Sequence, residues 1–230
     1  MATPEKVRKR VTPAVEDYLK AIYILQQHTN EVTTSMLSEQ MGGFKPGSVT
    51  GMMKRLADLK LVRYTPYQGV RLTDDGEKIA LEVIRHHRLI ELFLVKTLGY
   101  SWDEVHEEAE TLEHHISEKL EARIAEYLGQ PQFDPHGDPI PTLEGKLPPH
   151  TSKALSDLSV GQSGRITRVN DQNAEHLRYI ADLGIVPGTS IQVEETAPFE
   201  GPVSIRVGHK VHALDRRLAR TIQVECEPVV

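Results

Sequence analysis

The chain has 230 residues, a formal net charge of −6, and no apolar run long enough to span a membrane. Its single cysteine, Cys226, excludes a disulfide framework and any zinc ribbon with several cysteines. The length suits two or three small domains, and the N-terminal MATPEKVRKR lacks the apolar core of a signal peptide, so we expect a cytoplasmic protein.

Charge is distributed unevenly along the chain. Residues 1–75 carry 11 Lys and Arg against 8 Asp and Glu, residues 76–150 carry 7 against 15, and residues 151–230 carry 9 against 10. A basic region followed by an acidic one that also contains histidines indicates that one part of the protein binds a polyanion and another binds cations.

Residues 12–28 are predicted to form the first helix, with Thr12 as N-cap and Pro13 at its first position. Glu16 and Asp17 lie in its first turn. Both acidic side chains complement the positive end of the helix dipole, which would by itself account for them. Asp17 is also a candidate metal ligand.

A short helix at 33–41, a Gly-Gly turn at 42–43 and a second helix at 46–59 have the spacing of a helix-turn-helix. The second helix would turn Val49, Met53 and Leu56 inward. Small and polar residues that allow close approach to base edges gather at its start: Lys45, Gly47, Ser48, Thr50 and Gly51. Lys54 and Arg55 suit phosphate contacts. Two short helices about a glycine turn also occur in many protein cores.

Two β-prone runs, 61–65 and 69–73, flank a turn and predict a hairpin that would be the wing of a winged helix-turn-helix. A winged helix used for protein contacts is the alternative. The basic balance of this region favours DNA.

Two longer helices are predicted next, one at 75–97 closed by Gly99 and one at 103–128. On the second, at about 100° per residue, four side chains share one stripe: His106, Glu110, Glu113 and His114. The neighbouring stripe is apolar and continues through Leu120 and Ile124, which could form a dimer interface. These helices are too few to enclose a core without a second copy.

Two imidazoles and two carboxylates side by side outline a site for a first-row metal ion. The alternative is a solvated acidic helix face, which is common. The metal reading gains support because charges beside a packing stripe are costly unless they are paired or bound to metal. His87 and Glu91, one turn apart on the preceding helix, would make a second site with His106, although such a pair is often an ordinary surface pair.

Residues 142–151 are rich in proline and polar residues and are predicted to be a linker. Short strands punctuated by Gly and Pro follow, at 161–169, 190–195, 203–207, 210–213 and 221–224, with a short helix at 174–183. This pattern predicts a small β-barrel.

Several motifs together resemble the diphtheria toxin repressor family of metal-dependent transcriptional repressors. They are DYLKAIYIL, PGSVTGMMKRLADLKLV, GVRLTDDG, HHRLIELFL, VHEEAETLEHH and PHGDPIP, and they cover residues 12 to about 141. The last part, with HLRYIADLGIVPGTSIQV, is similar to the SH3-like domain of ferrous-iron transport protein A and of the three-domain metalloregulators.

The resemblance implies a ligand set for each of two metal sites. The primary site matches Asp17, Glu110, Glu113 and His114, and the ancillary site matches His87, Glu91 and His106. Glu175 or His176 lies near where relatives donate a further ancillary ligand, although a surface Glu-His pair is the alternative. The DNA-contacting positions of the family fall on Lys45, Gly47, Ser48, Thr50 and Gly51.

Two departures from the family pattern bear on the metal. Iron-type members have methionine and cysteine where this chain has Asp17 and Glu110, and oxygen donors favour Mn(II) over Fe(II). The two-domain manganese regulators have a glutamate ligand where this chain has Lys20. Fe(II) therefore stays an alternative, and other divalent first-row metals are expected to bind in vitro.

The sequence thus predicts an α+β multidomain protein. Its parts are a winged helix-turn-helix (1–75), a helical dimerisation and metal-binding domain (76–141), a linker (142–151) and an SH3-like barrel (152–230). We expect a homodimeric repressor that binds an inverted-repeat DNA operator when loaded with metal and controls metal-uptake genes, with no membrane or small-molecule substrate as partner. A metal-dependent enzyme or metal buffer is the alternative, but HEEAE at 106–110 lacks the second histidine of a zinc protease.

Overall fold

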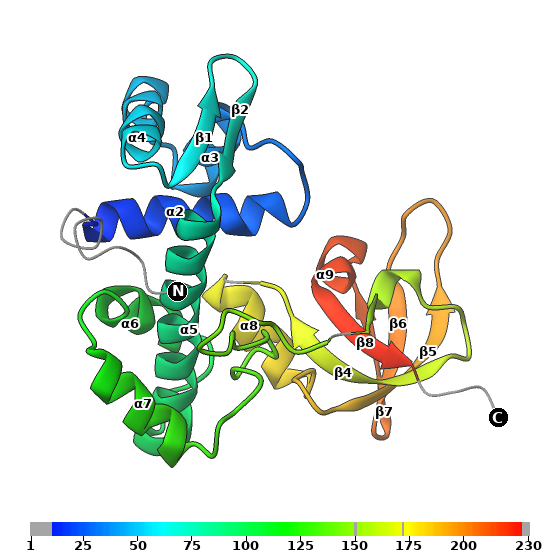
Figure 1. Ribbon diagram of the computed structural model, residues 1–230. Coiled ribbons are helices and arrows are strands. Elements are labelled where there is room, and N and C mark those ends of the chain that lie inside the picture. Colours follow the sequence, from blue (N-terminus) through cyan, green and yellow to red (C-terminus); the bar gives the residue numbers. More distant parts are fainter. Residues whose placement is uncertain (1–10, 150, 172, 227–230) are drawn as a thin grey trace. The chain divides into compact units, whose positions relative to one another are not determined.

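The computed structural model describes residues 11–149, 151–171 and 173–226, which form two compact units (Figure 1). The first unit contains the described residues up to 87, with 113–116 and 141–146. The second contains residues 88–112 and 117–140 and the described residues from 147 onward. Each unit is described below by itself.

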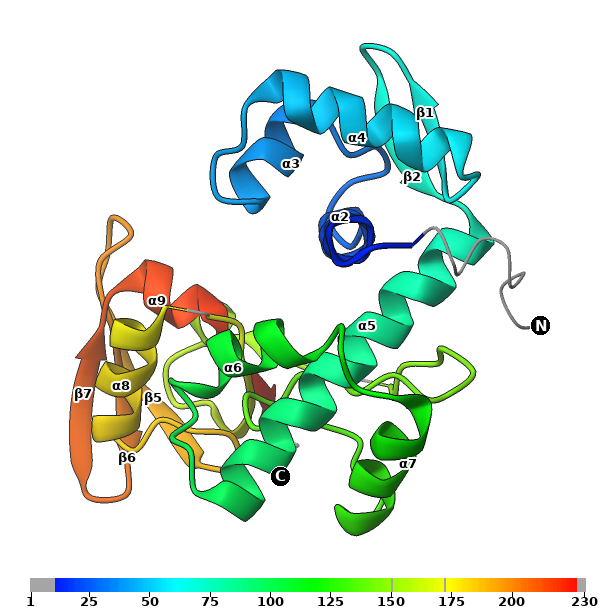
Figure 2. The ribbon, with the colours of Figure 1, turned by 90° about the vertical axis from the view of Figure 1, so that its left-hand side faces the viewer.

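The first unit contains a winged helix-turn-helix. In chain order its elements are α2 (Pro13–Gln26), α3 (Thr34–Gln40), α4 (Pro46–Asp58), β1 (Val62–Thr65) and β2 (Gly69–Leu72). Figure 2 looks along α2 and shows α3 and α4 on one side of it. Val49, Met53 and Leu56 are fully buried, which confirms the predicted inner face of α4. The hairpin pairs Val62 with Leu72 in antiparallel register, as expected for a wing.

The acidic region is helical, but its last predicted helix is divided. It contains α5 (Asp74–Phe93), a π-helical turn η1 (Leu94–Leu98), α6 (Val105–Leu112) and α7 (Glu118–Tyr127). Gly99 has φ 75°, which confirms it as the residue that ends the long helix. Among the described residues, no helix combines the length and the apolar character needed to cross a membrane.

The continuous helix predicted at 103–128 is wrong. Helix α6 ends at Leu112, and Ser117 begins a new helix by accepting a hydrogen bond from the Leu120 backbone N–H at 3.2 Å. A serine N-cap satisfies one of the donors that every helix start leaves unpaired, so α7 has its own beginning. Glu113 and His114 lie in the turn between α6 and α7.

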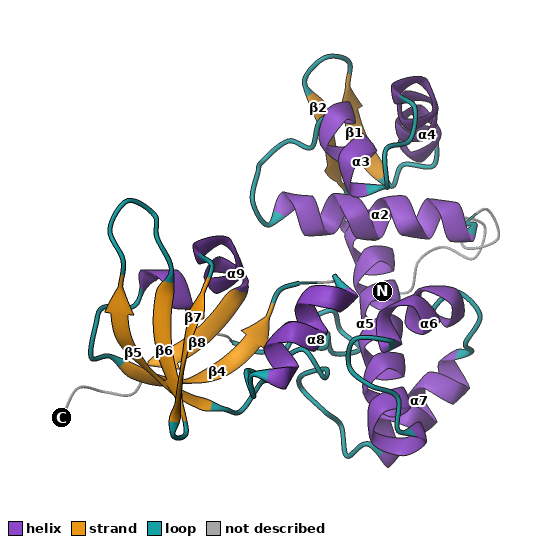
Figure 3. Cartoon of the chain, turned by 180° about the vertical axis from the view of Figure 1, so that it is seen from behind, coloured by secondary structure: helices purple, strands orange, loops and turns teal. Residues whose placement is uncertain are grey.

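The C-terminal part of the second unit is a six-stranded antiparallel sheet in the order β3-β8-β4-β5-β6-β7. Figure 3 shows strands of this sheet in orange. Its strands are β3 (Lys153–Ala154), β4 (Ser163–Val169), β5 (Ser190–Thr196), β6 (Val203–Val207), β7 (Lys210–Leu214) and β8 (Ile222–Cys226). Its helices are α8 (Ala174–Asp182), α9 (Arg216–Thr221) and the 3-10 turn η2 (Leu155–Asp157). Sequence reasoning missed α9 and β3.

The barrel packs directly on residues of the acidic region within the second unit. Trp102 packs against the barrel core. The Val169 backbone N–H donates to the His136 carbonyl at 2.8 Å, and Arg178 pairs with Asp103 at 2.8 Å. The barrel is therefore joined to the PHGDPIP turn by direct contacts in addition to the connecting chain.

Candidate metal centres and nucleic-acid interface

One candidate metal centre lies in the first unit and contains three of the four predicted primary ligands. Asp17 comes from the first turns of α2, and Glu113 and His114 come from the turn after α6. His114 Nε2 lies 2.8 Å from Asp17 Oδ1 and 3.5 Å from Glu113 Oε1. Each of the three residues offers a ligand atom within 4.8 Å of the others. Two carboxylates and an imidazole fit a first-row divalent cation.

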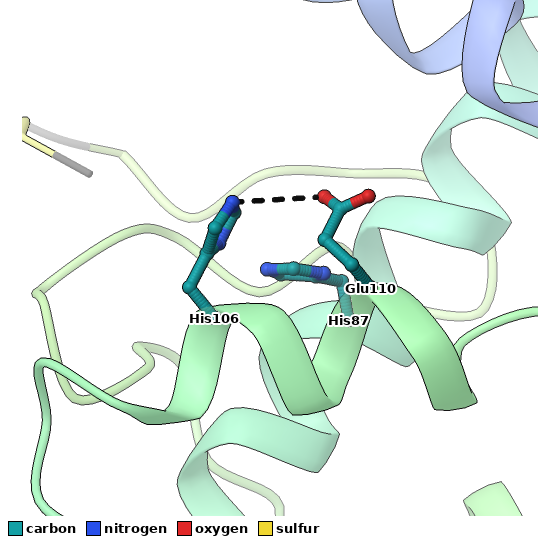
Figure 4. Close-up of side chains that lie close together, drawn as sticks. All are labelled: His87, His106 and Glu110. Carbon is teal, nitrogen blue, oxygen red and sulfur yellow. Dashed lines mark ion pairs between the residues drawn. The ribbon is translucent and has the colours of Figure 1, made fainter. Parts of the chain in front are cut away.

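The turn after α6 brings these candidate ligands together. They do not lie on the one continuous helical face that the sequence had predicted. Because α6 ends at Leu112, Glu113 and His114 do not continue the helical face that carries His106 and Glu110. Glu110 lies on α6, with its Oε1 3.8 Å from His106 Nε2; Figure 4 shows this pair together with His87 of α5.

Glu16 also belongs to the primary centre, although sequence reasoning gave it no role beyond the helix dipole. His114 Nδ1 donates to Glu16 Oε2 at 2.6 Å, so the opposite ring nitrogen, Nε2, faces Asp17 and Glu113. A carboxylate that binds the outer nitrogen of a histidine ligand fixes its tautomer and ring orientation. The signal in the sequence was the acidic neighbour of Asp17.

Carboxylates on both ring nitrogens control the protonation of His114. Hydrogen bonds to Asp17 and then to Glu16 raise the pKa of His114 to about 10, although burial opposes this. Without a metal ion the ring is therefore an imidazolium at neutral pH. A metal ion at Nε2 must displace that proton.

Glu113 is the most buried of the three candidate ligands of the primary centre, with 1% of its surface exposed. Its carboxylate accepts hydrogen bonds from Lys20 Nζ at 2.8 and 3.0 Å and lies 2.5 Å from His87 Nδ1. His87, which was predicted as an ancillary ligand, thus contacts a candidate ligand of the primary centre.

A second candidate centre lies in the second unit and is fully buried. Glu91 of α5 meets Asp134 and His136, with 2%, 7% and 7% of their surfaces exposed, and each offers a ligand atom within 4.8 Å of the others. His136 Nδ1 lies 3.7 Å from Glu91 Oε2, and His106 Nδ1 lies 3.4 Å from Glu91 Oε1. Glu91 and His106 were predicted as ancillary ligands, whereas Asp134 and His136 were not.

The PHGDPIP turn holds Asp134 and His136 in place. Asp134 Oδ1 accepts hydrogen bonds from the backbone N–H groups of His136 and Asp138, both at 2.8 Å. Gly137 has φ 84°, and a Cβ there would lie 1.9 Å from the Thr167 carbonyl oxygen, so no larger residue fits. The turn motif was visible in the sequence, but its proximity to Glu91 depends on tertiary packing.

Neighbouring groups orient His136 and set the protonation of the buried centre. The His136 ring stacks on Trp102 and its Nε2 donates to the Trp102 carbonyl at 2.7 Å, which leaves Nδ1 facing Glu91. Burial lowers the pKa of His136, but interactions with Glu91 and Asp134 outweigh it and raise the pKa to about 9. Burial, followed by Asp138 and Glu91, raises the pKa of Asp134 to about 8. A divalent cation would compensate the two buried carboxylates.

Glu175 and His176 lie at the exposed start of α8, where His176 Nδ1 is 2.9 Å from Asp171 Oδ2. Neither of them belongs to a metal-ligating cluster among the described residues. The possible ancillary role of these two residues stays a prediction.

The predicted DNA-contacting residues lie along the start and outer face of α4. Lys45 is its N-cap residue. Thr50 is partly exposed, and the rest of the set is exposed: Lys45, Gly47, Ser48, Gly51, Lys54 and Arg55. A Cβ added at Gly47 or Gly51 would meet no atom of the chain within 4 Å. Internal packing therefore does not require either glycine.

Three family models match the chain. They are the iron dependent repressor N-terminal DNA binding domain at residues 10–70, the iron dependent repressor metal binding and dimerisation domain at 73–142, and the FeoA domain at 153–226. The expected fold class of winged helix-turn-helix, helical domain and SH3-like barrel is thereby confirmed.

Named relatives span nearly the whole chain. The iron-dependent repressor IdeR of Mycobacterium tuberculosis (strain H37Rv) is 31% identical over 222 residues, which cover 91% of this chain and 96% of that one. The regulator MntR of Geobacillus kaustophilus is 33% identical over 123 residues, or 54% of this chain and 86% of that one.

A solved structure of a manganese-dependent transcriptional repressor in complex with manganese is 38% identical. Its TM-score is 0.86, with 93% of this chain and 100% of that chain covered. The relatives are repressors and not enzymes. The chain belongs to the diphtheria toxin repressor family of metal-dependent transcriptional regulators.

Proposed function

We propose that this repressor is a homodimer that binds an inverted-repeat operator when a metal ion occupies the primary centre, and that it controls metal-uptake genes. One observation carries the proposal. Asp17 lies on α2, which packs against the helix-turn-helix, whereas Glu113 and His114 lie in the turn between the helices of the acidic region. An ion bound by all three would join these two segments.

Such a link would couple metal binding to DNA binding. An ion that fixes α2 against the turn lowers the ordering that operator binding requires. Thermodynamic reciprocity then requires that the operator raises metal affinity by the same factor, typically about 5–150-fold for coupled sites. Glu110, which the family resemblance adds to the ligand set, would complete the primary centre.

The donor set favours Mn(II) as the activating ion. The three clustered ligands are two carboxylates and an imidazole, and no sulfur donor is among them. Carboxylate-rich sites suit Mn(II), whereas soft sulfur ligands suit softer ions. Fe(II) is the alternative, because an iron-dependent repressor and a manganese-dependent repressor both match the chain.

We further propose that the buried cluster of Glu91, Asp134 and His136 is the ancillary metal site, with His106 beside Glu91. The support is the donor set and its burial, since two carboxylates and an imidazole within 4.8 Å of one another suit a first-row divalent cation. His87, predicted for this site, contacts Glu113 of the primary centre, so its part in metal binding lies closer to the primary ion.

A glycine in the middle of α4 supports this helix as the DNA-reading one. Gly51 lies inside α4, where glycine destabilises a helix by about 1 kcal/mol relative to alanine. A Cβ at this position would meet no other atom within 4 Å, so packing within the chain does not explain why the destabilising glycine is present. A close approach of α4 to the base edges of DNA would explain the glycine, because a side chain there would hold the helix away.

An apolar surface on α7 supports dimerisation. Leu120 and Tyr127 are 48% and 69% exposed and, with Phe93 and Ile124, line a hollow of about 460 Å³. Exposed apolar surface of this kind marks interaction sites. A second copy of the chain would cover it.

The test is an anisotropy titration of labelled promoter DNA with the full chain and Mn(II), Fe(II) or Zn(II) in turn, under anaerobic conditions. We expect binding that requires metal, with Mn(II) activating most strongly. Zn(II) should bind more tightly than Mn(II) yet activate less, because it prefers four ligands.

Gly51→Ala should melt at a higher temperature than the parent and bind the operator more weakly. Metal-independent binding, or full operator affinity in Gly51→Ala, would contradict the proposal.

A further inference from the structure

Lys20 lies within the primary centre, although a cation is an unexpected neighbour for metal ligands. It is on α2, and its ammonium donates to both carboxylate oxygens of Glu113, at 3.0 and 2.8 Å. The same Nζ lies 3.3 Å from His87 Nδ1. The side chain of Lys20 is 12% exposed, and that of Glu113 is fully buried.

The surroundings of this ammonium resemble those of a bound metal ion. A carboxylate and an imidazole nitrogen face one positive centre that is nearly excluded from water. In two-metal sites the ions lie about 3.5–4 Å apart and share bridging carboxylates. Glu113 has that bridging position here, because its Oε1 is also 3.5 Å from His114 Nε2, the nitrogen that would bind the primary ion.

We infer that the Lys20 ammonium takes the place of a second metal ion, so that the primary centre loads with one ion and not with a pair. This inference rests on the proposed metal site. The ammonium occupies the lone pairs that a second ion would need, and its charge repels a divalent cation next to it. It also holds the Glu113 carboxylate in one orientation toward the primary ion.

The alternative is an ordinary buried ion pair that only stabilises the fold. The two readings differ in what happens when metal is added. A cation that substitutes for a metal ion determines how many ions bind, and part of its role passes to the primary ion once that ion binds Glu113. A purely structural pair leaves the number of bound ions unchanged when it is removed.

The first experiment counts bound Mn(II) per chain in the full-length parent, in Lys20→Glu and in Lys78→Glu, by equilibrium dialysis with elemental analysis. Lys78 is on α5, with a side chain 47% exposed, so Lys78→Glu makes the same charge change away from the centre. We expect one additional ion per chain in Lys20→Glu and no change in Lys78→Glu. The added ion should be magnetically coupled to the first, which electron paramagnetic resonance would detect.

The second experiment keeps the inference testable if Lys20→Glu fails to fold. Lys20→Met removes the ammonium and keeps the length of the side chain. We expect its melting temperature to fall strongly without metal, because Glu113 then loses a buried counter-charge, and to fall less with saturating Mn(II).

The outcomes separate the inference from the function on which it rests. Equal ion counts in folded Lys20→Glu and the parent, or equal loss of melting temperature with and without Mn(II) in Lys20→Met, would overturn the inference alone. A parent protein that binds no Mn(II) at the primary centre would refute the proposed function as well.

Discussion

The primary centre and the buried cluster of Glu91, Asp134 and His136 are built in different ways. The primary centre joins Asp17, with a side chain 35% exposed, to a turn far along the chain. The second cluster joins buried Glu91 to a turn braced by its own backbone hydrogen bonds and by Trp102. Both offer carboxylates and one imidazole, so donor type does not distinguish them.

What distinguishes the clusters is the part of the chain that a metal ion would hold in place. An ion in the primary centre would link α2, which packs against the helix-turn-helix, to another segment. An ion in the second cluster would link α5 to the PHGDPIP turn, and both of these segments belong to the second unit at that point. We therefore expect the first to control DNA binding and the second to support the fold of the second unit.

The largest expected effect is that of His114→Ala. Because the variant loses a primary ligand, it should lose the whole metal-dependent gain in operator affinity, about 5–150-fold for couplings of this kind. Operator anisotropy with and without Mn(II) measures it. His115→Ala is the matched control, since the neighbouring histidine is exposed. A retained metal response in folded His114→Ala would assign the control of DNA binding elsewhere.

The pH dependence of metal affinity should separate the clusters next. Without metal, His114 holds a proton up to about pH 10, so an ion in the primary centre displaces one proton and its affinity rises about tenfold per pH unit from pH 6 to 7. In the buried cluster, burial raises the pKa of Asp134 and the neighbouring carboxylates raise the pKa of His136, so an ion there displaces protons from this pair. Its affinity should rise more steeply with pH than that of the primary centre over the same range. Calorimetric Mn(II) titrations of Glu113→Gln and Glu91→Gln, each with one centre removed, test this, and equal slopes would contradict it.

Glu16→Gln tests whether the outer carboxylate of the primary centre orients His114. Loss of such a partner typically lowers metal affinity about 10–100-fold, although the substituted residue is not itself a ligand. Mn(II) titration of Glu16→Gln against Glu31→Gln, a change at an exposed glutamate, measures it. An unchanged affinity would mean that packing alone fixes the ring.

The smallest effect on operator binding should come from His136→Ala. This variant should bind one Mn(II) fewer per chain and melt at a lower temperature, yet keep most of the metal-dependent gain in operator affinity. Ion counting and anisotropy on the same preparation give both numbers. If His136→Ala lost as much operator affinity as His114→Ala, the division of roles between the clusters would be wrong.

Local elements were predicted well because their signals lie in neighbouring residues. The buried face of α4, the hairpin and the helix stop at Gly99 follow from helical period, strand alternation and the left-handed conformation that glycine tolerates. The failure at 103–128 has the same basis, since the acidic and apolar residues continue a helical period across the break. Ser117 nevertheless caps a new helix, so the chain turns between α6 and α7 although the periodic pattern continues.

The sequence by itself determined which ligand types the protein has and which helices and turns carry them. Tertiary structure alone decided that Glu16 reaches His114, that Lys20 lies against Glu113, and that Asp134 and His136 meet Glu91. The physical reason is the range of the interactions. Helical period and caps act over a few residues, whereas a metal centre depends on segments that meet only when the hydrophobic cores of the two units close.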